Sequence, residues 1–97
     1  MGVLSMLLID IGLTNSDLDA IALEDVEQLK KRGKQRHSVD EWMLIASEEV
    51  GEAAKAILEG RNNKGKLEEV EKECIQAATL YLKIAAMVRR YREHLIT

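Results

Sequence analysis

The sequence has no proline, no phenylalanine and only three aromatic side chains, which are Trp42 and two tyrosines. Hydrophobic residues nevertheless make up 46% of its 97 residues, so the apolar side chains are mostly Ala, Leu, Ile and Val. A core of this kind without proline favours helices over sheets. We expect a single all-α domain over residues 1–97, with a thin core because a chain this short buries only about 60 to 70% of its unfolded surface.

Cysteine, histidine and net charge are also scarce. The one cysteine, Cys74, cannot form an internal disulfide, which fits a reducing, cytoplasmic location. The net charge of −3 argues against a general nucleic-acid binder, including a DNA-binding antitoxin. The two histidines lie far apart, no Cys/His cluster has zinc spacing, and no glycine-rich phosphate loop is present.

The first 14 residues are apolar but resemble neither a membrane anchor nor a signal peptide. The segment is too short to span a bilayer and has no basic residue before the apolar run. Residues 1–14 are therefore expected to pack on the domain or on a partner subunit, or to be loosely packed.

A first helix is expected over about residues 17–32. Apolar residues recur there every three or four positions, Asn15 or Ser16 can cap its start, and Gly33 can end it. Its apolar stripe should pack against the other helices. The basic run over residues 30–36 either complements the helix dipole or forms a basic rim that attracts a phosphorylated substrate.

The second helix has a clear start. Ser38 and Glu41 have the spacing of a capping box, and the helix should run to Glu59, with Gly60 as its stop. Gly51 in mid-helix costs about 1 kcal/mol relative to Ala, which a close approach by another helix would explain. His37, just before the cap, is interpreted as a loop residue rather than a catalytic base.

The third helix is expected to begin at 64–66 and to end near His94. One apolar stripe along it comprises Leu67, Val70, Cys74, Ala77, Tyr81, Ile84 and Val88. A second stripe comprises Ile75, Ala78, Leu82 and Ala85. One antiparallel pair of helices cannot cover both stripes, so we predict an antiparallel helical bundle completed as a homodimer or homotetramer.

Acidic side chains recur within these apolar helices. Glu48, Glu49 and Glu52 lie in the second helix and Glu73 in the third, with Gln76 one turn later. Residues three or four apart share a helix face, so two antiparallel helices would bring these oxygens together. Converging negative charge in apolar surroundings indicates a divalent cation. The alternative is that these glutamates form the solvated face of amphipathic helices.

These residues also carry a family resemblance, which covers roughly residues 33–86. The segments Ser38 to Trp42, Glu48 to Ile57 and Glu73 to Ala78 resemble the MazG-like all-α nucleoside triphosphate pyrophosphohydrolases, whose pattern is EExxE followed by ExxD. The resemblance implies a helical bundle assembled as a dimer or tetramer and Mg²⁺ as cofactor, with Mn²⁺ as a substitute. It also implies cleavage between the α and β phosphates of a nucleoside triphosphate.

The same resemblance assigns roles to residues of this chain. Glu49, Glu52 and Glu73 would be metal ligands, and Glu48 an adjacent acidic residue that orients or activates water. Gln76 stands where the family has Asp; it keeps an amide oxygen but is a poorer Mg²⁺ ligand. Another register uses Glu68 and Glu71, which are instead expected to face solvent.

Substrate contacts are expected from a further set of residues. Lys83 lies two helical turns after Gln76 and could reach a phosphate, whereas Trp42 could stack on a base or belong to the core. The short loop offers three more polar candidates: Arg61, Asn63 and Lys64. The sequence thus predicts a nucleotide pyrophosphohydrolase, or a non-catalytic oligomerisation or regulatory module derived from one because of Gln76.

Overall fold

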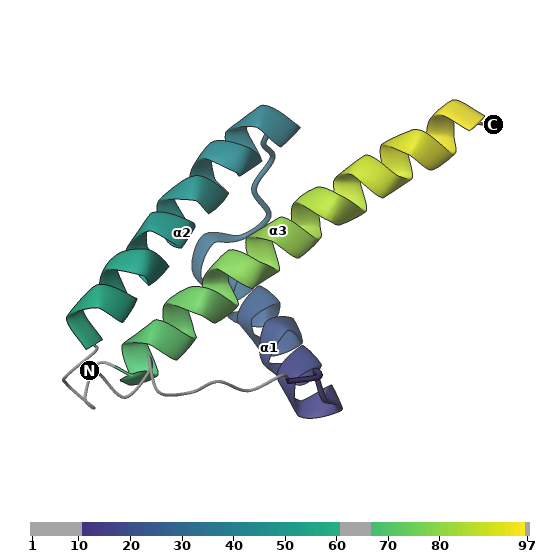
Figure 1. The fold of residues 1–97 in the computed structure, drawn as a ribbon. Helices are drawn as coiled ribbons and strands as arrows, with labels where there is room; N and C mark the ends of the chain where they lie inside the picture. The colour runs from purple at the N-terminus through teal and green to yellow at the C-terminus, as the bar shows by residue number, and fades with distance from the viewer. Residues whose placement is uncertain (1–10, 61–66, 97) are drawn as a thin grey trace.

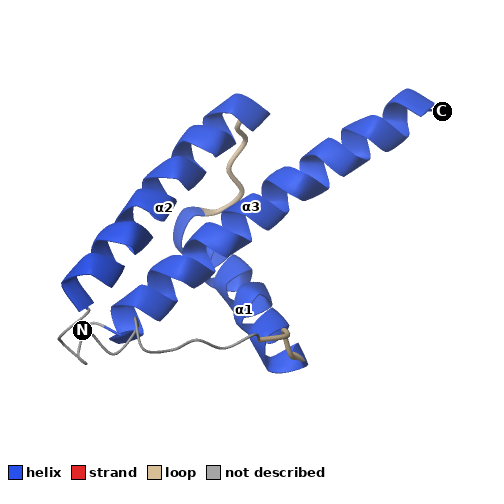
Figure 2. Cartoon of the chain, in the orientation of Figure 1, coloured by secondary structure: helices blue, strands red, loops and turns tan. Residues whose placement is uncertain are grey.

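The structure, a computed structural model, describes residues 11–60 and 67–96, and these contain three helices, the first two of which are joined by a loop over residues 33–38 (Figure 2). The helices are α1 (Asn15–Arg32), α2 (Val39–Gly60) and α3 (Leu67–Ile96). α2 and α3 lie side by side and antiparallel, while α1 crosses α3 steeply (Figure 1). The predicted all-α class and the antiparallel pairing of the second and third helices are confirmed.

The first helix begins two residues earlier than the sequence indicates, at Asn15 rather than at about Asp17. Its cap is Thr14 and not Asn15 or Ser16: Thr14 N–H donates to Asp17 Oδ2 at 2.8 Å, and Asp17 N–H donates to Thr14 Oγ1 at 3.4 Å. This is a capping box with Asp in place of Glu or Gln at its third position. The predicted stop is confirmed, because Gly33 has φ 67° and its N–H donates to the Leu29 carbonyl at 2.9 Å.

The capping box predicted for α2 is present. Ser38 N–H donates to Glu41 Oε1 at 3.2 Å, and Glu41 N–H donates to Ser38 Oγ at 3.2 Å. His37 is a loop residue, as expected; its Nδ1 lies 3.3 Å from Glu41 Oε2 and its ring meets Trp42 edge-on at 4.8 Å. These contacts fix the direction in which α2 leaves the loop.

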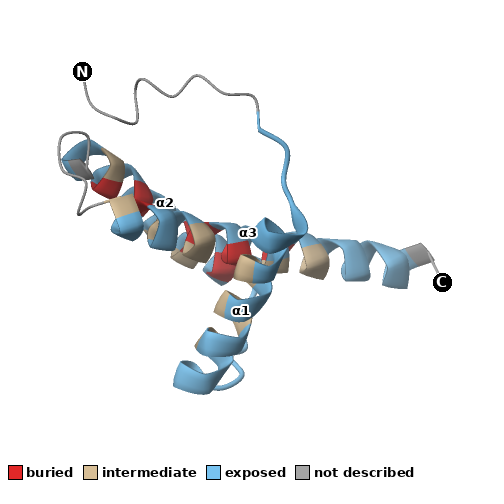
Figure 3. Ribbon diagram, turned by 90° about the horizontal axis from the view of Figure 1, so that it is seen from below, coloured by how far each residue is buried: buried red, intermediate tan, exposed pale blue. Residues whose placement is uncertain are grey.

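The core lies along the seam between α2 and α3 (Figure 3). Its central cluster is Trp42, Ala46, Leu80 and Ile84, and the other buried apolar residues are Ala53, Ala56, Val70 and Ala77. Alanines allow the two backbones to approach closely and leave little volume to fill. Thr79, only 2% exposed, satisfies its hydroxyl by donating to the Ile75 carbonyl at 2.7 Å.

The predicted apolar stripes are covered only where they face this seam. Of the first stripe, Cys74, Tyr81 and Val88 are exposed. The second stripe is mostly exposed as well, with Leu82 57% accessible. One neighbouring helix covers a narrow strip of α3, which explains why both stripes remain partly open in the single chain.

The expected packing of α1 is also incomplete. None of its residues is buried, and Leu18, Val26 and Leu29 are all exposed. Because α1 crosses α3 steeply, the two helices meet over a short length, and α1 stands away from the pair formed by α2 and α3 (Figure 3). The crossing creates a cleft that helices packed in parallel would have filled.

Gly51 does not mark a close helix contact in the single chain, contrary to the expectation. A Cβ built on it would have no described atom within 4 Å, because Gly51 is exposed on α2. None of the described helices has the length and apolarity needed to cross a membrane. Residues 1–10 lie outside the described part of the chain, and Ile11 and Leu13, which precede α1, are exposed.

Candidate functional site

Three of the predicted carboxylates converge between α2 and α3. Glu49 and Glu52 are one turn apart on α2, Glu73 comes from α3, and one oxygen from each lies within 4.8 Å of the others. Glu49 and Glu73 are partly buried, whereas Glu52 is exposed. The helical spacing and the antiparallel pairing together place them at one point, as the sequence predicts.

The converging carboxylates alter the acidity of Glu49. Burial raises the pKa of Glu49 above the ordinary glutamate value, and the charges of Glu73 and Glu52 raise it further. A hydrogen bond with Glu73 adds to this rise, while the positive charge of Arg32 lowers the pKa. Glu49 therefore holds a proton more readily than a solvated glutamate does.

Gln76 faces two of these carboxylates from α3. The amide can form hydrogen bonds with both carboxylates when its nitrogen points toward them. In that orientation Nε2 donates to Glu49 Oε2 and to Glu73 Oε2, each at 3.2 Å. The opposite assignment would place the amide oxygen against acceptors only. With its nitrogen toward them Gln76 donates to both carboxylates, whereas with the amide turned over its oxygen faces the same two oxygens, as a metal ligand's would.

The carboxylate cluster of Glu49, Glu52 and Glu73 has the chemistry that a hard cation needs. Magnesium binds oxygen ligands at about 2.0–2.1 Å, so neighbouring ligand oxygens are about 2.9 Å apart and opposite ones about 4.2 Å. Separations of up to 4.8 Å require only small side-chain rotations to reach these values. The oxygens of this cluster thus fit a small divalent cation.

A large open cleft adjoins the cluster. It has a volume of about 1380 Å³ and lies between α1, the loop that follows it, α2 and α3. Glu48, Glu49 and Gln76 line it on one side, whereas Glu52 and Glu73 line a smaller hollow of about 290 Å³ beyond the cluster. The basic residues of the cleft are Lys31, Arg32, Lys34, Arg36, Lys72, Lys83 and Arg90.

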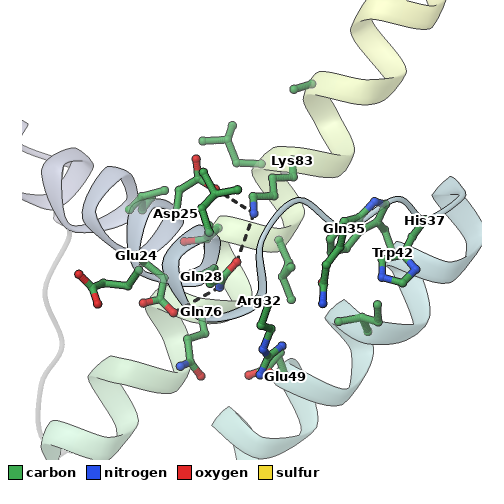
Figure 4. A pocket seen from close by; sticks show the side chains of 18 of the residues that line it. Glu24, Asp25, Gln28, Arg32, Gln35, His37, Trp42, Glu49, Gln76 and Lys83 are labelled. Atoms are coloured by element: carbon green, nitrogen blue, oxygen red, sulfur yellow. Dashed lines mark hydrogen bonds and ion pairs between the residues drawn. The ribbon is translucent and has the colours of Figure 1, made fainter.

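Arg32 is a residue of this cleft to which the sequence assigned no specific role. It ends α1, and Figure 4 shows its side chain extending toward Glu49. The basic run over residues 30–36 was the only signal for it. Its position next to a carboxylate on α2 depends on how α1 crosses α3, which periodicity does not encode.

Lys83 occupies the opposite part of the cleft and links α3 to α1. Its Nζ lies 2.8 Å from Asp25 Oδ1 and donates to Gln28 Oε1 at 3.2 Å, as Figure 4 shows. It also lies 5.8 Å from the centre of the Trp42 ring. The predicted phosphate contact of Lys83 would therefore compete with these partners.

The remaining predicted residues divide into three groups. Trp42 is a core residue, 9% exposed, whose ring also borders the cleft. Glu48 is exposed at the cleft and is not part of the three-carboxylate cluster, and Glu68 and Glu71 face solvent as expected. Arg61, Asn63 and Lys64 lie outside the described residues.

The site thus combines a carboxylate cluster suited to a cation with a cleft whose walls carry both basic and acidic side chains, the acidic ones being Glu24, Asp25, Glu27, Glu48 and Glu49. Such an arrangement can bind an anion whose oxygens also reach the cation. Comparisons of the chain with protein-family models, with curated proteins and with solved structures found no match.

Proposed function

We propose that this chain is a Mg²⁺-dependent nucleoside triphosphate pyrophosphohydrolase. It would cleave the bond between the α and β phosphates and release a nucleoside monophosphate and pyrophosphate. The observation that carries the proposal is the convergence of Glu49, Glu52 and Glu73 from two helices beside a cleft that also holds basic side chains. The resemblance of residues 33–86 to the MazG-like enzymes points to the same reaction.

Different residues of the chain would bind the cation, contact the phosphates and accept the proton of the attacking water. Glu49, Glu52 and Glu73 would hold Mg²⁺, which when bound supplies neutralisation of phosphate charge and a more acidic water. Arg32 would contact the phosphate chain, because it reaches the cleft wall next to Glu49. Glu48, exposed at the same wall, would accept the proton of the attacking water.

The test is pyrophosphate release from a panel of nucleoside triphosphates. Glu52→Gln removes one ligand charge, keeps the side-chain volume and should lower turnover by about 100-fold or more, since the cation would lose a carboxylate. The matched control is Glu68→Gln, which makes the same chemical change at an exposed position on α3. Equal turnover in Glu52→Gln and the wild-type chain would refute the site.

A second function is favoured by the hydrogen bonds of Gln76. With its nitrogen toward Glu49 and Glu73, the amide donates to both carboxylates and brings no oxygen to the cluster. This suits a non-catalytic oligomerisation or regulatory module in which the cluster holds helices together. Calorimetric titration with Mg²⁺ separates the two functions, because the module would give no binding heat with or without a nucleotide.

A further inference from the structure

The exposed apolar residues of α3 form one row along the helix. They recur at alternating intervals of three and four residues, with Arg92 in the one position of the row that is not apolar. The apolar members, all exposed, are Cys74, Ala78, Tyr81, Ala85, Val88 and Leu95. This is the spacing of the contact face in paired helices, and it continues here for about three heptads.

The row lies on the side of α3 away from the cleft. None of its residues lines the cleft, whereas Lys83, which links α3 to α1, does. Residues 88–95 are all exposed, and this end of α3 extends away from α2 (Figure 1). A further helix could therefore pack along the row without displacing α1 or closing the cleft.

The two ends of α3 carry opposite charge. Four glutamates and one lysine lie between residues 68 and 73, whereas three arginines and one glutamate lie between residues 89 and 93. In a parallel pair of identical helices each charged end meets a copy of itself. In an antiparallel pair the acidic end of each helix meets the basic end of the other, so the charges favour an antiparallel second copy as the partner.

We propose that α3 pairs antiparallel with α3 of a second copy of this chain along this row. The exposed stripes alone predict an oligomer, and the row and the charges give it an orientation and a register. A register that sets Tyr81 opposite Ala85 of the second copy also sets Ala78 opposite Val88, so that each large side chain meets a small one. The interface is two-fold symmetric, and each of these contacts occurs twice.

The same register makes two contacts that can be measured. It sets Cys74 opposite Arg92 of the second copy, and it brings Glu71 within one helical turn of that arginine. Neither Glu71 nor Arg92 lines the cleft or belongs to the carboxylate cluster. The inference is therefore independent of the proposed catalysis, and its test needs neither a nucleotide nor a metal ion.

Cross-linking of chains that carry one cysteine each tests the orientation. The wild-type chain, whose only cysteine is Cys74, is refolded together with the variant Cys74→Ser, Arg92→Cys and treated with a short bis-maleimide. We expect cross-links between the two different chains, identified by mass, and few between identical chains, whose cysteines would lie roughly 27 Å apart along the helix axis. The matched control is Cys74→Ser, Arg90→Cys, because Arg90 lines the cleft.

The other outcomes would overturn the inference. Cross-linking of the wild-type chain to itself through Cys74 would indicate a parallel pair. Equal cross-linking with the Arg92→Cys and Arg90→Cys variants, or none with either, would mean that another surface forms the contact. A wild-type chain that sediments as a monomer at all concentrations would exclude the pairing altogether.

An exchange of charges tests the register. Glu71→Arg should weaken the dimer by about three- to tenfold, because it sets two like charges together at both ends of the interface. Adding Arg92→Glu to the same chain should restore the wild-type dissociation constant, measured by sedimentation equilibrium. Weakening that the second substitution does not reverse would refute the proposed contact between Glu71 and Arg92.

Discussion

Several opposing effects act on the pKa of Glu49, and each has an identified cause. Burial and two neighbouring carboxylates favour its protonated form, while Arg32 favours its charged form. The net result is a raised pKa, so proton binding and cation binding compete at this carboxyl group. A glutamate on a solvated helix face, the simpler interpretation of the sequence, would not show this competition.

The raised pKa predicts a pH dependence of stability in the absence of metal. Below the ordinary pKa of glutamate, Glu49 is protonated in both folded and unfolded chains, and its stabilising contribution is fully present. As the pH rises through its raised folded-state pKa, that contribution is lost because the folded chain has to release a proton that it binds more tightly than the unfolded chain.

The measurement is the midpoint of thermal unfolding in a chelator over a range of pH. Glu49→Gln should abolish the loss of stability that Glu49 causes as the pH rises. The variant should therefore gain stability relative to the wild type as the pH rises through the Glu49 pKa. The difference between the two chains isolates this group from Asp17 and Glu41, whose lowered pKa values act in the opposite direction. A constant difference at all pH values would exclude a raised pKa for Glu49.

Sequence reasoning located the carboxylates but not the role of the amide. Glu49, Glu52 and Glu73 follow from helical spacing and one antiparallel pairing, and both of these can be inferred from the sequence. The orientation of Gln76 could not be inferred, because it depends on which atoms of α2 face it. The contribution of Arg32 depends in the same way on a tertiary contact.

At the scale of the elements, α1 is the least firmly attached helix. It buries no residue, and its link to α3 runs through Lys83, which binds Asp25 and Gln28. The partners are partly exposed, so the ion pair is worth only about 0.2–1 kcal/mol.

Replacing Lys83 by Met tests this attachment. The variant keeps the apolar stem but loses the ammonium group, so we expect faster amide hydrogen exchange in α1 with little change in the seam between α2 and α3. Hydrogen exchange resolved by mass spectrometry would measure both regions. Equal protection of α1 in the two chains would mean that other contacts hold the helix.

Gly51 provides a second test at this scale. In the single chain its Cα has open space around it, so Gly51→Ala should stabilise α2 by about 0.5–1 kcal/mol through helix propensity alone. Denaturant unfolding of the variant would measure the change. Destabilisation would instead show that another subunit packs against this glycine, which is the close approach that the sequence suggested.

The whole molecule has more apolar surface than its core uses. Large exposed side chains occur on all three helices, among them Leu23, Leu44, Leu58, Leu82 and Tyr91, each at least 57% accessible. An interaction surface would require some of these side chains to form a contiguous apolar patch. The predicted homodimer or homotetramer would cover such faces, in particular the second stripe of α3.

The oligomer prediction is tested by sedimentation velocity over a range of concentrations. The wild-type chain should sediment as a dimer or tetramer, and Ala78→Arg, which places a charge on the second stripe, should shift it toward the monomer. Glu68→Arg, at a position expected to face solvent, is the control. A wild-type chain that is monomeric at all concentrations would contradict the prediction.

The three helices and the antiparallel pairing of α2 with α3 could be predicted from the sequence. The placement of α1 could not. The Ser38–Glu41 capping box, Gly33 and the apolar spacing of α2 and α3 are local signals, and they gave the helices nearly correct bounds. The polar contacts between α1 and α3, those of Lys83 with Asp25 and Gln28, join residues far apart in sequence, and periodicity does not encode how the two helices cross. The cleft that results from this crossing was therefore not predictable, although it supplies the basic wall of the candidate site.

Binding of Mn²⁺ to the carboxylate cluster, titrated by electron paramagnetic resonance, tests the central claim most directly. We predict a saturable site in the wild-type chain that is weakened by about tenfold or more in Glu49→Gln, Glu52→Gln and Glu73→Gln, since each variant removes one ligand charge. The site should be unchanged in Glu68→Gln. Equal Mn²⁺ binding by all five chains, or none by the wild type, would contradict a cation site formed by these three carboxylates.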